Sequence, residues 1–355
     1  MTLGIFLSMG GSFKDMAEAG QDELFKKFYL SYFAENFDKV YIFSYENEKE
    51  RDLPKNVYLI PNRYKLHRYI YSLLIPLINS SYISKCDVFR AYHLYGTVPA
   101  IISRIFFQKP FIFNWAYDYK KFAQIEKKFL QFILIFFLKP VAETFASKIF
   151  RVDRQYCAKD KDIYLPNGVD TNFFKPMKVK KNKTPLILSV GRLERQKNYE
   201  NLIRALKGLR ANLLLVGSGS LKNKLIKIAK KEDINLKIIE RIENTKMPHI
   251  YNRADIFILP SVIEGSPKAL LEAMSCKLPV IGTKVDGIKN IILDGKNGLL
   301  VENDNHNINL AIKRLIGDRK LKEKLAEEAR VFVKGYHNLK FLIKLEIEAI
   351  KNINT

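Results

Sequence analysis

Apolar positions along the chain follow two different periods. Short apolar runs, such as 3–8 and 40–44, have the length of buried strands, whereas 17–33 repeats apolar residues at helical spacing. Further strands are predicted at 57–61, 88–91 and 111–114, and a helix at 98–107. Alternating strands and helices predict a parallel sheet with helices on both faces.

This pattern stops near the middle of the chain and then starts again. Pro166, Asn167, Gly168, Pro176 and a lysine cluster interrupt it over 165–184. Beyond this break, strands are predicted at 186–190, 213–216, 236–239, 256–260 and 279–282, and helices at 199–209, 221–231, 248–252, 268–276 and from 308 onward. The sequence therefore predicts an α/β fold with two Rossmann-like, doubly wound domains.

The length of 355 residues agrees with two domains, because one hydrophobic core rarely serves so long a chain. We expect a first domain over 1–165, a second over 166–338, and a C-terminal helix over 339–355 that packs back on the first. Two such sheets facing one another leave a cleft at the carboxyl ends of their strands, where ligands of these sheets bind. The functional residues are sought there.

Cysteine usage and hydropathy favour the cytoplasm. Cys86, Cys157 and Cys276 lie far apart and match neither a disulfide framework nor a zinc site. The apolar start, 3–7, has no basic region before it and no cleavage site after it, so it is interpreted as a strand. The most apolar run, 130–138, is shorter than the roughly 20 residues of a spanning helix.

A formal net charge of +23 admits three explanations: lysine-rich composition with solvated faces, an anionic membrane surface, or nucleic acid. No zinc-finger, RNP or helix-turn-helix pattern accompanies the charge, so no nucleic-acid partner is predicted. Over 62–78 and 117–150, basic residues alternate with aromatic and aliphatic ones, as in amphipathic helices on anionic lipid. Buried core helices with basic flanks explain these two stretches equally well.

The first candidate motif follows the predicted strand 186–190. Gly191 permits a tight turn, and Arg192 and Lys197 place two cations before a helix that offers free N–H groups. Such a loop suits a diphosphate, although a solvated basic loop is the commoner arrangement. Gly217 lies in a second glycine turn, 216–219, which is too short a pattern for a nicotinamide cofactor.

The second candidate motif follows the predicted strand 256–260. Glu264 lies in the loop and Glu272 on the next helix, so the two carboxylates can contact different ends of one ligand. Gly265 and Ser266 place backbone N–H groups at the helix start, where phosphate or hydroxyl oxygens bind. A surface loop capped by Ser266, with Pro267 at the first helical position, explains the same residues.

Taken together, these motifs resemble the large family of retaining glycosyltransferases with two Rossmann-like domains, the GT-B glycosyltransferases of family 4. The segment 167–170, followed by Phe173 and Pro176, is similar to that family's interdomain segment. The resemblance covers residues 166–303, with the motifs in the same order and context, and extends more loosely over the N-terminal half. It implies an acceptor-binding N-terminal domain and a C-terminal domain that binds a nucleotide diphosphate sugar.

The resemblance also implies roles for the charged residues. Arg192 and Lys197 would neutralise the charge that builds on the departing diphosphate. Glu264 would bind hydroxyls of the donor sugar, and Glu272 would bind the ribose hydroxyls of the nucleotide.

Small residues complete the implied binding surface. Gly265, Ser266 and Pro267 would line the pyrophosphate and sugar pocket through their backbone, beside the turns that hold Gly191 and Gly217. Gly10 and Gly11, after the first strand, match the family's glycine loop, where backbone amides approach phosphate.

The N-terminal half departs from the family. Many members carry a catalytic-site histidine after the strand that corresponds to 111–114, but here 114–118 contains none. Asp118 and Tyr117 are the candidates for this place in the cleft. His93, after an earlier strand, is a third, with a structural histidine as its alternative. Members of the family are thought to use the leaving phosphate to assist deprotonation of the acceptor, so a protein base is not required.

No metal and no cofactor are expected. Asp160 and Asp162 form a D-x-D pair, but they lie in a lysine-rich stretch before the interdomain segment, and two cationic side chains already supply the charge that a metal would.

The resulting hypothesis is a cytoplasmic, metal-independent, retaining transferase of a hexose or N-acetylhexosamine. Its donor would be a UDP-sugar or, second, GDP-mannose, and its acceptor a glycan or lipid-linked saccharide used for cell-surface polysaccharide or glycolipid, at the inner membrane face. A nucleotide-sugar epimerase of the same fold would need no acceptor. A basic nucleic-acid-binding protein would show salt-sensitive binding to DNA or RNA.

Overall fold

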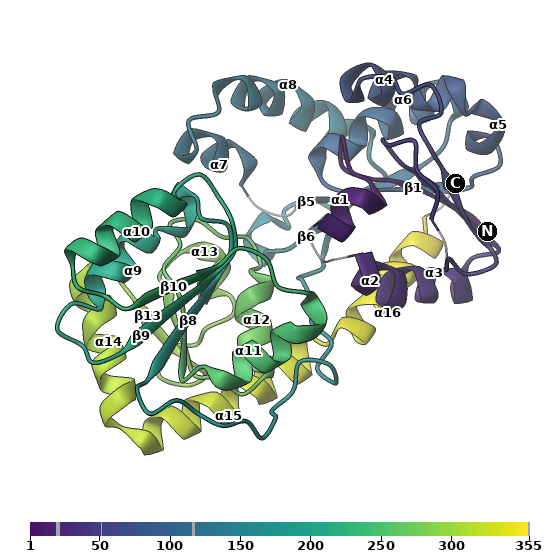
Figure 1. Cartoon of the computed structure of the whole chain (residues 1–355). Coiled ribbons are helices and arrows are strands. Elements are labelled where there is room, and N and C mark those ends of the chain that lie inside the picture. The colour runs from purple at the N-terminus through teal and green to yellow at the C-terminus, as the bar shows by residue number, and fades with distance from the viewer. Residues whose placement is uncertain (19–21, 51, 116–117, 354–355) are drawn as a thin grey trace. The chain divides into compact units, whose positions relative to one another are not determined.

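A computed structural model describes residues 1–18, 22–50, 52–115 and 118–353. The chain forms two α/β units (Figure 1). Unit 1 comprises Met1–Lys120, Phe129–Pro166 and Lys340–Thr355, and unit 2 comprises Lys121–Lys128 and Asn167–Leu339. The main passage from unit 1 to unit 2 therefore falls between Pro166 and Asn167, and the segment Lys121–Lys128, which lies inside the first predicted domain, belongs to unit 2.

Unit 1 contains a sheet of seven strands in its described residues, in the order β3-β2-β1-β4-β5-β6-β7. In that order the strands are Val57–Ile60, Lys39–Phe43, Thr2–Phe6, Val88–Ala91, Phe111–Trp115, Lys148–Arg151 and Asp162–Tyr164. Every pairing is parallel; Ile5 of β1, for example, lies between Ile42 of β2 and Arg90 of β4. Phe6 stacks on Phe89 with ring centroids 4.6 Å apart, so aromatic rings build much of this core.

Helices connect these strands. They are α1 Phe13–Glu18, α2 Asp22–Leu24, the π-helical segment Phe25–Leu30, α3 Ser31–Asn36, α4 Arg68–Ile78, α5 Ser80–Ile83, α6 Thr97–Phe107, α7 Tyr119–Ile125, α8 Phe129–Phe145 and α16 Leu339–Lys351, with short 3₁₀ turns at Leu94–Gly96 and Arg154–Tyr156. The α7 helix crosses the boundary between the units, and from Lys340 onward α16 belongs to unit 1. No helix among the described residues has both the length and the apolar character needed to cross a membrane.

Unit 2 repeats the strand order of unit 1 in a six-stranded parallel sheet, β10-β9-β8-β11-β12-β13, counted over its described residues. In that order the strands are Leu236–Ile239, Asn212–Val216, Leu186–Val190, Ile256–Leu259, Val280–Thr283 and Leu299–Val301. The helices are α9 Tyr199–Ala205, α10 Lys222–Lys231, α11 Met247–Arg253, α12 Lys268–Ser275, α13 Asp286–Lys289, α14 Asn305–Gly317 and α15 Arg319–Tyr336, with 3₁₀ turns at Arg195–Lys197 and Asn244–Lys246.

Both faces of the unit 2 sheet are buried. Ile187, Leu213 and Ile258 belong to one core cluster, whereas their neighbours Leu188 and Leu214 belong to the other. Successive side chains of a strand point to opposite faces, so a strand covered on both sides must be apolar at nearly every position. This is why β8, β9 and β11 were visible in the sequence as continuous apolar runs.

Several predicted elements need correction. The helix predicted over 17–33 begins at Phe13, because the Ser12 hydroxyl accepts the backbone N–H of Asp15 at 3.0 Å and caps it. The described part of that stretch is divided among α1, α2 and the π-helical segment before α3 begins at Ser31. The predicted amphipathic stretch 117–150 ends in strand β6, and β6, β7 and β13, of three or four residues each, were not predicted.

Candidate functional site

The two motif loops of unit 2 leave neighbouring strands. Strand β8 pairs directly with β11, and the order of the sheet reverses between them. This reversal is the switch point at which doubly wound sheets bind ligands, outside the carboxyl ends of the strands. The loops that begin at Gly191 and Pro260 therefore lie side by side.

An ion pair joins the two loops. The Lys197 ammonium lies 2.5 Å from Oε1 of Glu264, and the Ser261 hydroxyl donates to the same oxygen at 2.6 Å. The two charged side chains are only 12% and 8% exposed. Two residues that the sequence analysis assigned to diphosphate and sugar recognition thus contact one another, and their charges are held in a largely desolvated position where electrostatic interactions are strong.

Side-chain amides connect the loops around this pair. The side-chain amide of Gln196 donates to the Ile263 carbonyl at 2.9 Å, and the backbone carbonyl of Gln196 accepts the N–H of Val262 at 2.9 Å. Asn303 donates to the Ser261 carbonyl and accepts from Asn198. The sequence analysis missed Gln196, Ser261 and Asn303. Gln196 and Ser261 could have been found, since both lie inside the motif loops, but Asn303 is distant in sequence.

Arg192 is exposed and lies at the edge of this cluster. Its guanidinium donates to the Gln196 side-chain carbonyl at 3.1 Å and lies over the Phe122 ring, 5.3 Å from the centroid. Glu126, from the same short segment, accepts the backbone N–H of Gln196 at 2.9 Å. The segment Lys121–Lys128 therefore packs against the first motif loop, a contact that was not predicted.

Glycines allow the loops of unit 2 to approach closely. A Cβ on Gly191 would lie 2.8 Å from a side-chain carbon of Lys197, and one on Gly217 would lie 2.1 Å from the carbonyl oxygen of Gly191. Gly287, which the sequence analysis did not single out, has the same function for the second loop: its Cβ would lie 2.2 Å from the Gly265 oxygen and 2.5 Å from that of Glu264. All three positions need glycine for steric reasons.

The start of helix α12 differs from the predicted cap. Ser266 is buried, and its hydroxyl accepts the backbone N–H of Asn167 at 3.1 Å instead of capping the helix, whose N-cap residue is Pro267. The prediction that Ser266 caps α12 with Pro267 as its first residue is therefore wrong. Among the described residues, the N–H groups of Gly265, Ser266, Lys268 and Ala269 have no acceptor, so they can bind oxygen atoms of a ligand.

Glu272 lies on α12 and accepts a hydrogen bond from the Tyr251 hydroxyl at 2.7 Å. Burial raises the pKa of this carboxyl to about 7, against the opposing effect of the hydrogen bond. Near neutral pH the group can therefore be either an acceptor only or a donor as well, which suits contact with hydroxyl groups.

The remaining candidates lie in unit 1. Asp118 is half-buried directly before α7, whereas Tyr117 falls outside the described residues. Gly10 has φ of +83°, and the N–H of Gly11 donates to the Ser8 carbonyl at 2.7 Å, so this N–H already has a partner inside the turn.

His93 follows β4 with a positive φ of 60°, an uncommon backbone conformation for a non-glycine residue. Its Nδ1 lies 3.2 Å from the Tyr119 hydroxyl and 3.3 Å from the Asn114 amide, and its N–H donates to the Asn114 carbonyl oxygen. These contacts agree with a histidine held in one orientation by its neighbours.

The D-x-D pair has an internal role at Asp162. Its carboxylate accepts from Arg151 at 2.9 Å and from the backbone N–H groups of Ala158 and Lys159, and its side chain is 1% exposed. Asp162 therefore fixes the turn before β7.

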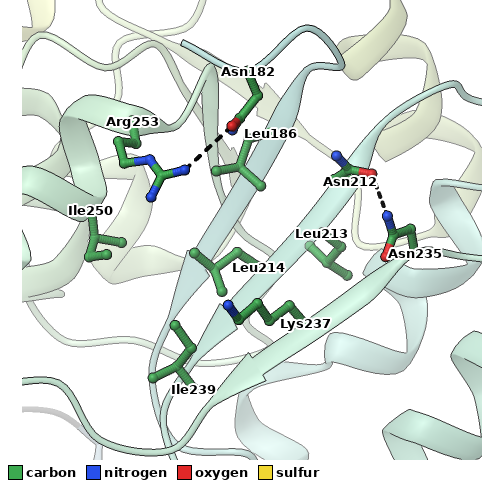
Figure 2. Close-up of a pocket in the computed structure, with 10 residues that line it drawn as sticks. All are labelled: Asn182, Leu186, Asn212, Leu213, Leu214, Asn235, Lys237, Ile239, Ile250 and Arg253. Atoms are coloured by element: carbon green, nitrogen blue, oxygen red, sulfur yellow. Dashed lines mark hydrogen bonds between the residues drawn. The ribbon is translucent and has the colours of Figure 1, made fainter. Parts of the chain in front are cut away.

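A pocket of about 240 Å³ lies elsewhere on unit 2 (Figure 2). It is lined by the first residues of β8 and β9, Leu186 and Asn212, and by side chains of β10 and α11, including Lys237 and Arg253. Arg253 donates to Asn182, and Asn235 to Asn212, across this pocket. No residue of the two motif loops lines it, so it is separate from the candidate site.

The fold agrees with the comparisons. The whole chain is similar in structure to sucrose-phosphate synthase from Thermosynechococcus elongatus, with a TM-score of 0.85, 17% identity and 99% of each chain covered. At this identity the likeness shows the fold, which is GT-B. Residues 170–332 match the family described as glycosyl transferases group 1.

Curated relatives match about half of the chain. A Campylobacter jejuni N-acetylgalactosamine-N,N'-diacetylbacillosaminyl-diphospho-undecaprenol 4-alpha-N-acetylgalactosaminyltransferase is 33% identical over 163 residues, 44% of each chain. An Escherichia coli UDP-Gal:alpha-D-GlcNAc-diphosphoundecaprenol alpha-1,3-galactosyltransferase is 31% identical over 220 residues, which are 55% of this chain and 57% of the relative. The chain thus spans about half the length of the curated relatives it matches.

Proposed function

We propose that this protein is a retaining glycosyltransferase that moves a hexose or N-acetylhexosamine from a nucleotide diphosphate sugar to a lipid-linked saccharide. The observation that carries the proposal is the Lys197–Glu264 pair, with Arg192 nearby, at the switch point of the unit that matches the family. Transferases of nucleotide sugars must stabilise the charge of the departing diphosphate, and preorganised cations do this effectively where water is excluded. Retention of configuration rests on the motif resemblance.

The relatives' names support the substrate classes. The Escherichia coli enzyme is named for a UDP-sugar donor, and both relatives are named for diphospho-undecaprenol acceptors. A UDP-sugar is therefore the first donor we propose, with GDP-mannose second. Since an undecaprenol chain lies in the membrane and nucleotide sugars are made in the cytoplasm, we place the protein at the inner membrane face, without a metal or cofactor.

The test is release of nucleotide diphosphate from UDP-, GDP- and ADP-sugars, with and without membrane lipid extract as acceptor. Lys197→Met and Glu264→Gln should each lower acceptor-dependent release by about 100-fold or more, which is the usual cost of losing one charge-stabilising group. Lys207→Met removes a comparable pair from the surface, where Lys207 lies 3.0 Å from Glu232, and should release product at the wild-type rate.

The other outcomes identify the alternatives. Conversion of the nucleotide sugar without any acceptor would indicate an epimerase. Salt-sensitive binding to DNA or RNA with no nucleotide sugar bound would contradict the proposal and favour a nucleic-acid-binding protein. The anomeric configuration of the product, read from its NMR coupling constant, tests retention.

A further inference from the structure

Three neighbouring helices of unit 1 expose large apolar side chains. On α8 these are Phe129, Leu130, Ile133, Leu134, Phe136, Phe137, Val141 and Phe145; on α4, Tyr69, Ile70, Leu73 and Leu77; on α6, Ile105 and Phe106. Helix α6 packs against both α4 and α8, and Figure 1 draws the three helices together at the upper side of unit 1. We call this region the α4–α6–α8 face.

The exposure is large for each helix. Leu130 is 81% exposed, Phe106 67% and Phe137 65%, whereas on α8 only Ile135 and Ala142 are buried. On α4 the exposed positions 69, 70, 73 and 77 repeat at helical spacing, so they form one outward stripe. Soluble monomers rarely expose so much contiguous apolar surface, and a larger patch marks an interaction site.

The charge around this face is almost entirely positive. From residue 53 to 117 the sequence contains eight lysines and arginines and a single acidic residue, Asp87. Three exposed cations lie before α4 or at its first residue: Arg63, Lys65 and Arg68. They form no ion pair with another described residue. The only acidic residue of α8, Glu143, pairs with Arg151, Lys159 and Lys139.

We propose that the α4–α6–α8 face docks on the surface of an anionic lipid bilayer, with its apolar side chains inserted among the acyl chains and its cations at the headgroups. Amphipathic helices with this combination of apolar and basic residues lie in the plane of the membrane interface. A second copy of the chain fits less well. In a symmetric dimer the same patch contributes to both sides, so this face would bring like charges together.

This inference rests on the proposed function, because a lipid-linked acceptor has its reactive end at the membrane surface. Docking through unit 1 would hold the transferase where that end is located. It also explains why the apolar residues of α8 are exposed. The alternative interpretation of this stretch of sequence was a helix buried in the core.

The test is co-sedimentation of the full chain with vesicles that contain no saccharide acceptor, made of phosphatidylcholine alone or mixed with phosphatidylglycerol. We expect binding to the mixed vesicles that weakens as salt is raised, because salt screens exposed charges. The variant Phe106→Gln, Leu130→Gln, Phe137→Gln should bind at least about tenfold more weakly, since it lacks three large apolar side chains whose removal from water favours insertion.

The matched control carries the same kind of change on unit 2. Leu310, Val331 and Tyr336 are 48%, 57% and 67% exposed on α14 and α15, and their replacement by Gln should leave vesicle binding unchanged. Equal loss in both triple variants, or no binding to mixed vesicles, would overturn the proposal. So would a concentration-dependent dimer in light scattering that only the α8 variant loses.

Vesicle binding requires no sugar transfer, so failure here leaves the transferase proposal standing. Conversely, a protein that binds vesicles but releases no nucleotide diphosphate would contradict the proposed function alone.

Discussion

The two units share one strand order but use it for different chemistry. In unit 2, the switch point between β8 and β11 holds the Lys197–Glu264 pair in the loops that follow these strands. In unit 1, the equivalent point between β1 and β4 holds the Gly10–Gly11 turn and His93. The exposed Arg68 side chain lies next to Gly10, and the buried Arg90 lies inside β4 itself. The same topology therefore specifies where a ligand site can form, while the loop residues decide what it binds.

The surroundings of two buried ion pairs, one in each unit, explain this difference. Arg90 Nε lies 2.6 Å from Glu346 of α16, and Nη1 donates to the Ala91 carbonyl at 2.7 Å. The guanidinium also lies between the rings of Tyr92 and Phe150, 4.7 and 5.0 Å from their centroids. With contacts on every side, this pair attaches the C-terminal helix to the sheet.

Lys197, in contrast, has three ammonium protons and a single ion-pair partner among the described residues. It lies in a loop at the carboxyl edge of the sheet, where oxygen atoms of a ligand can accept hydrogen bonds from its remaining N–H groups. We propose from this comparison that the unit 1 pair stabilises the fold, whereas the unit 2 pair serves a ligand.

Removal of Arg90 should have the largest effect on stability. Arg90→Met leaves the Glu346 carboxylate buried without a partner, so we expect a loss of about 3–5 kcal/mol in the free energy of unfolding, measured with urea. Lys197→Met should lose less, because its site is open to ligand and solvent at one edge. Equal losses in the two variants would break the comparison, and the double variant Arg90→Met, Glu346→Leu should recover part of the stability.

A methyl group on Gly287 tests the second loop without removing any charge. Its Cβ would overlap the carbonyl oxygens of Glu264 and Gly265, so Gly287→Ala must displace this loop. We expect a loss of about 1–3 kcal/mol in stability and roughly tenfold to hundredfold slower transfer, because small displacements near reacting groups are costly. Gly335→Ala, at a position in α15 with no atom within 4 Å of the new Cβ, is the control and should change neither.

Glu272→Gln should have an effect that depends on pH, and at pH 5 it should be the smallest of the three. The folded pKa of about 7 lies above the ordinary value of 4.5, so folding disfavours the ionised carboxylate and the wild type loses stability as pH rises from 4.5 to about 7. Glutamine does not ionise. The variant should therefore be more stable than the wild type at pH 8, by about 1–3 kcal/mol, with little difference at pH 5.

Thermal unfolding at these two pH values measures the effect. A difference that is the same at both values would show that the raised pKa has no part in it. Tyr251→Phe removes the hydrogen bond that opposes the rise in the pKa of Glu272. This variant should therefore lose more stability than the wild type between pH 5 and pH 8.

Most strands could be predicted because they are buried on both faces. Such strands as β8 and β11 are apolar at almost every position, which distinguishes them from the amphipathic helices around them. Strands β7 and β13 are short and only partly buried, so they carry too few apolar residues to show a pattern. The divided helix near residue 25 was also missed, because apolar spacing does not distinguish α-helical from π-helical turns.

In the candidate site, the sequence pointed to individual residues but not to their contacts. Lys197 and Glu264 were both found from their positions after strands, yet their direct pairing depends on β8 and β11 being neighbours. The bond from Asn167 to Ser266 and the contact of Gly287 with the second loop join residues far apart in the chain. Local patterns carry no information about such contacts.

By itself, then, the sequence determined the class of fold, the boundary near residue 166 and the two motif loops, because each of these is written in local periodicity, glycine placement and charge. The tertiary structure alone decided that Lys197 pairs with Glu264, that Arg90 joins α16 to the first sheet, and that α8 exposes its apolar face. These features depend on which elements become neighbours, and burial and pairing are properties of the assembled packing rather than of any one segment.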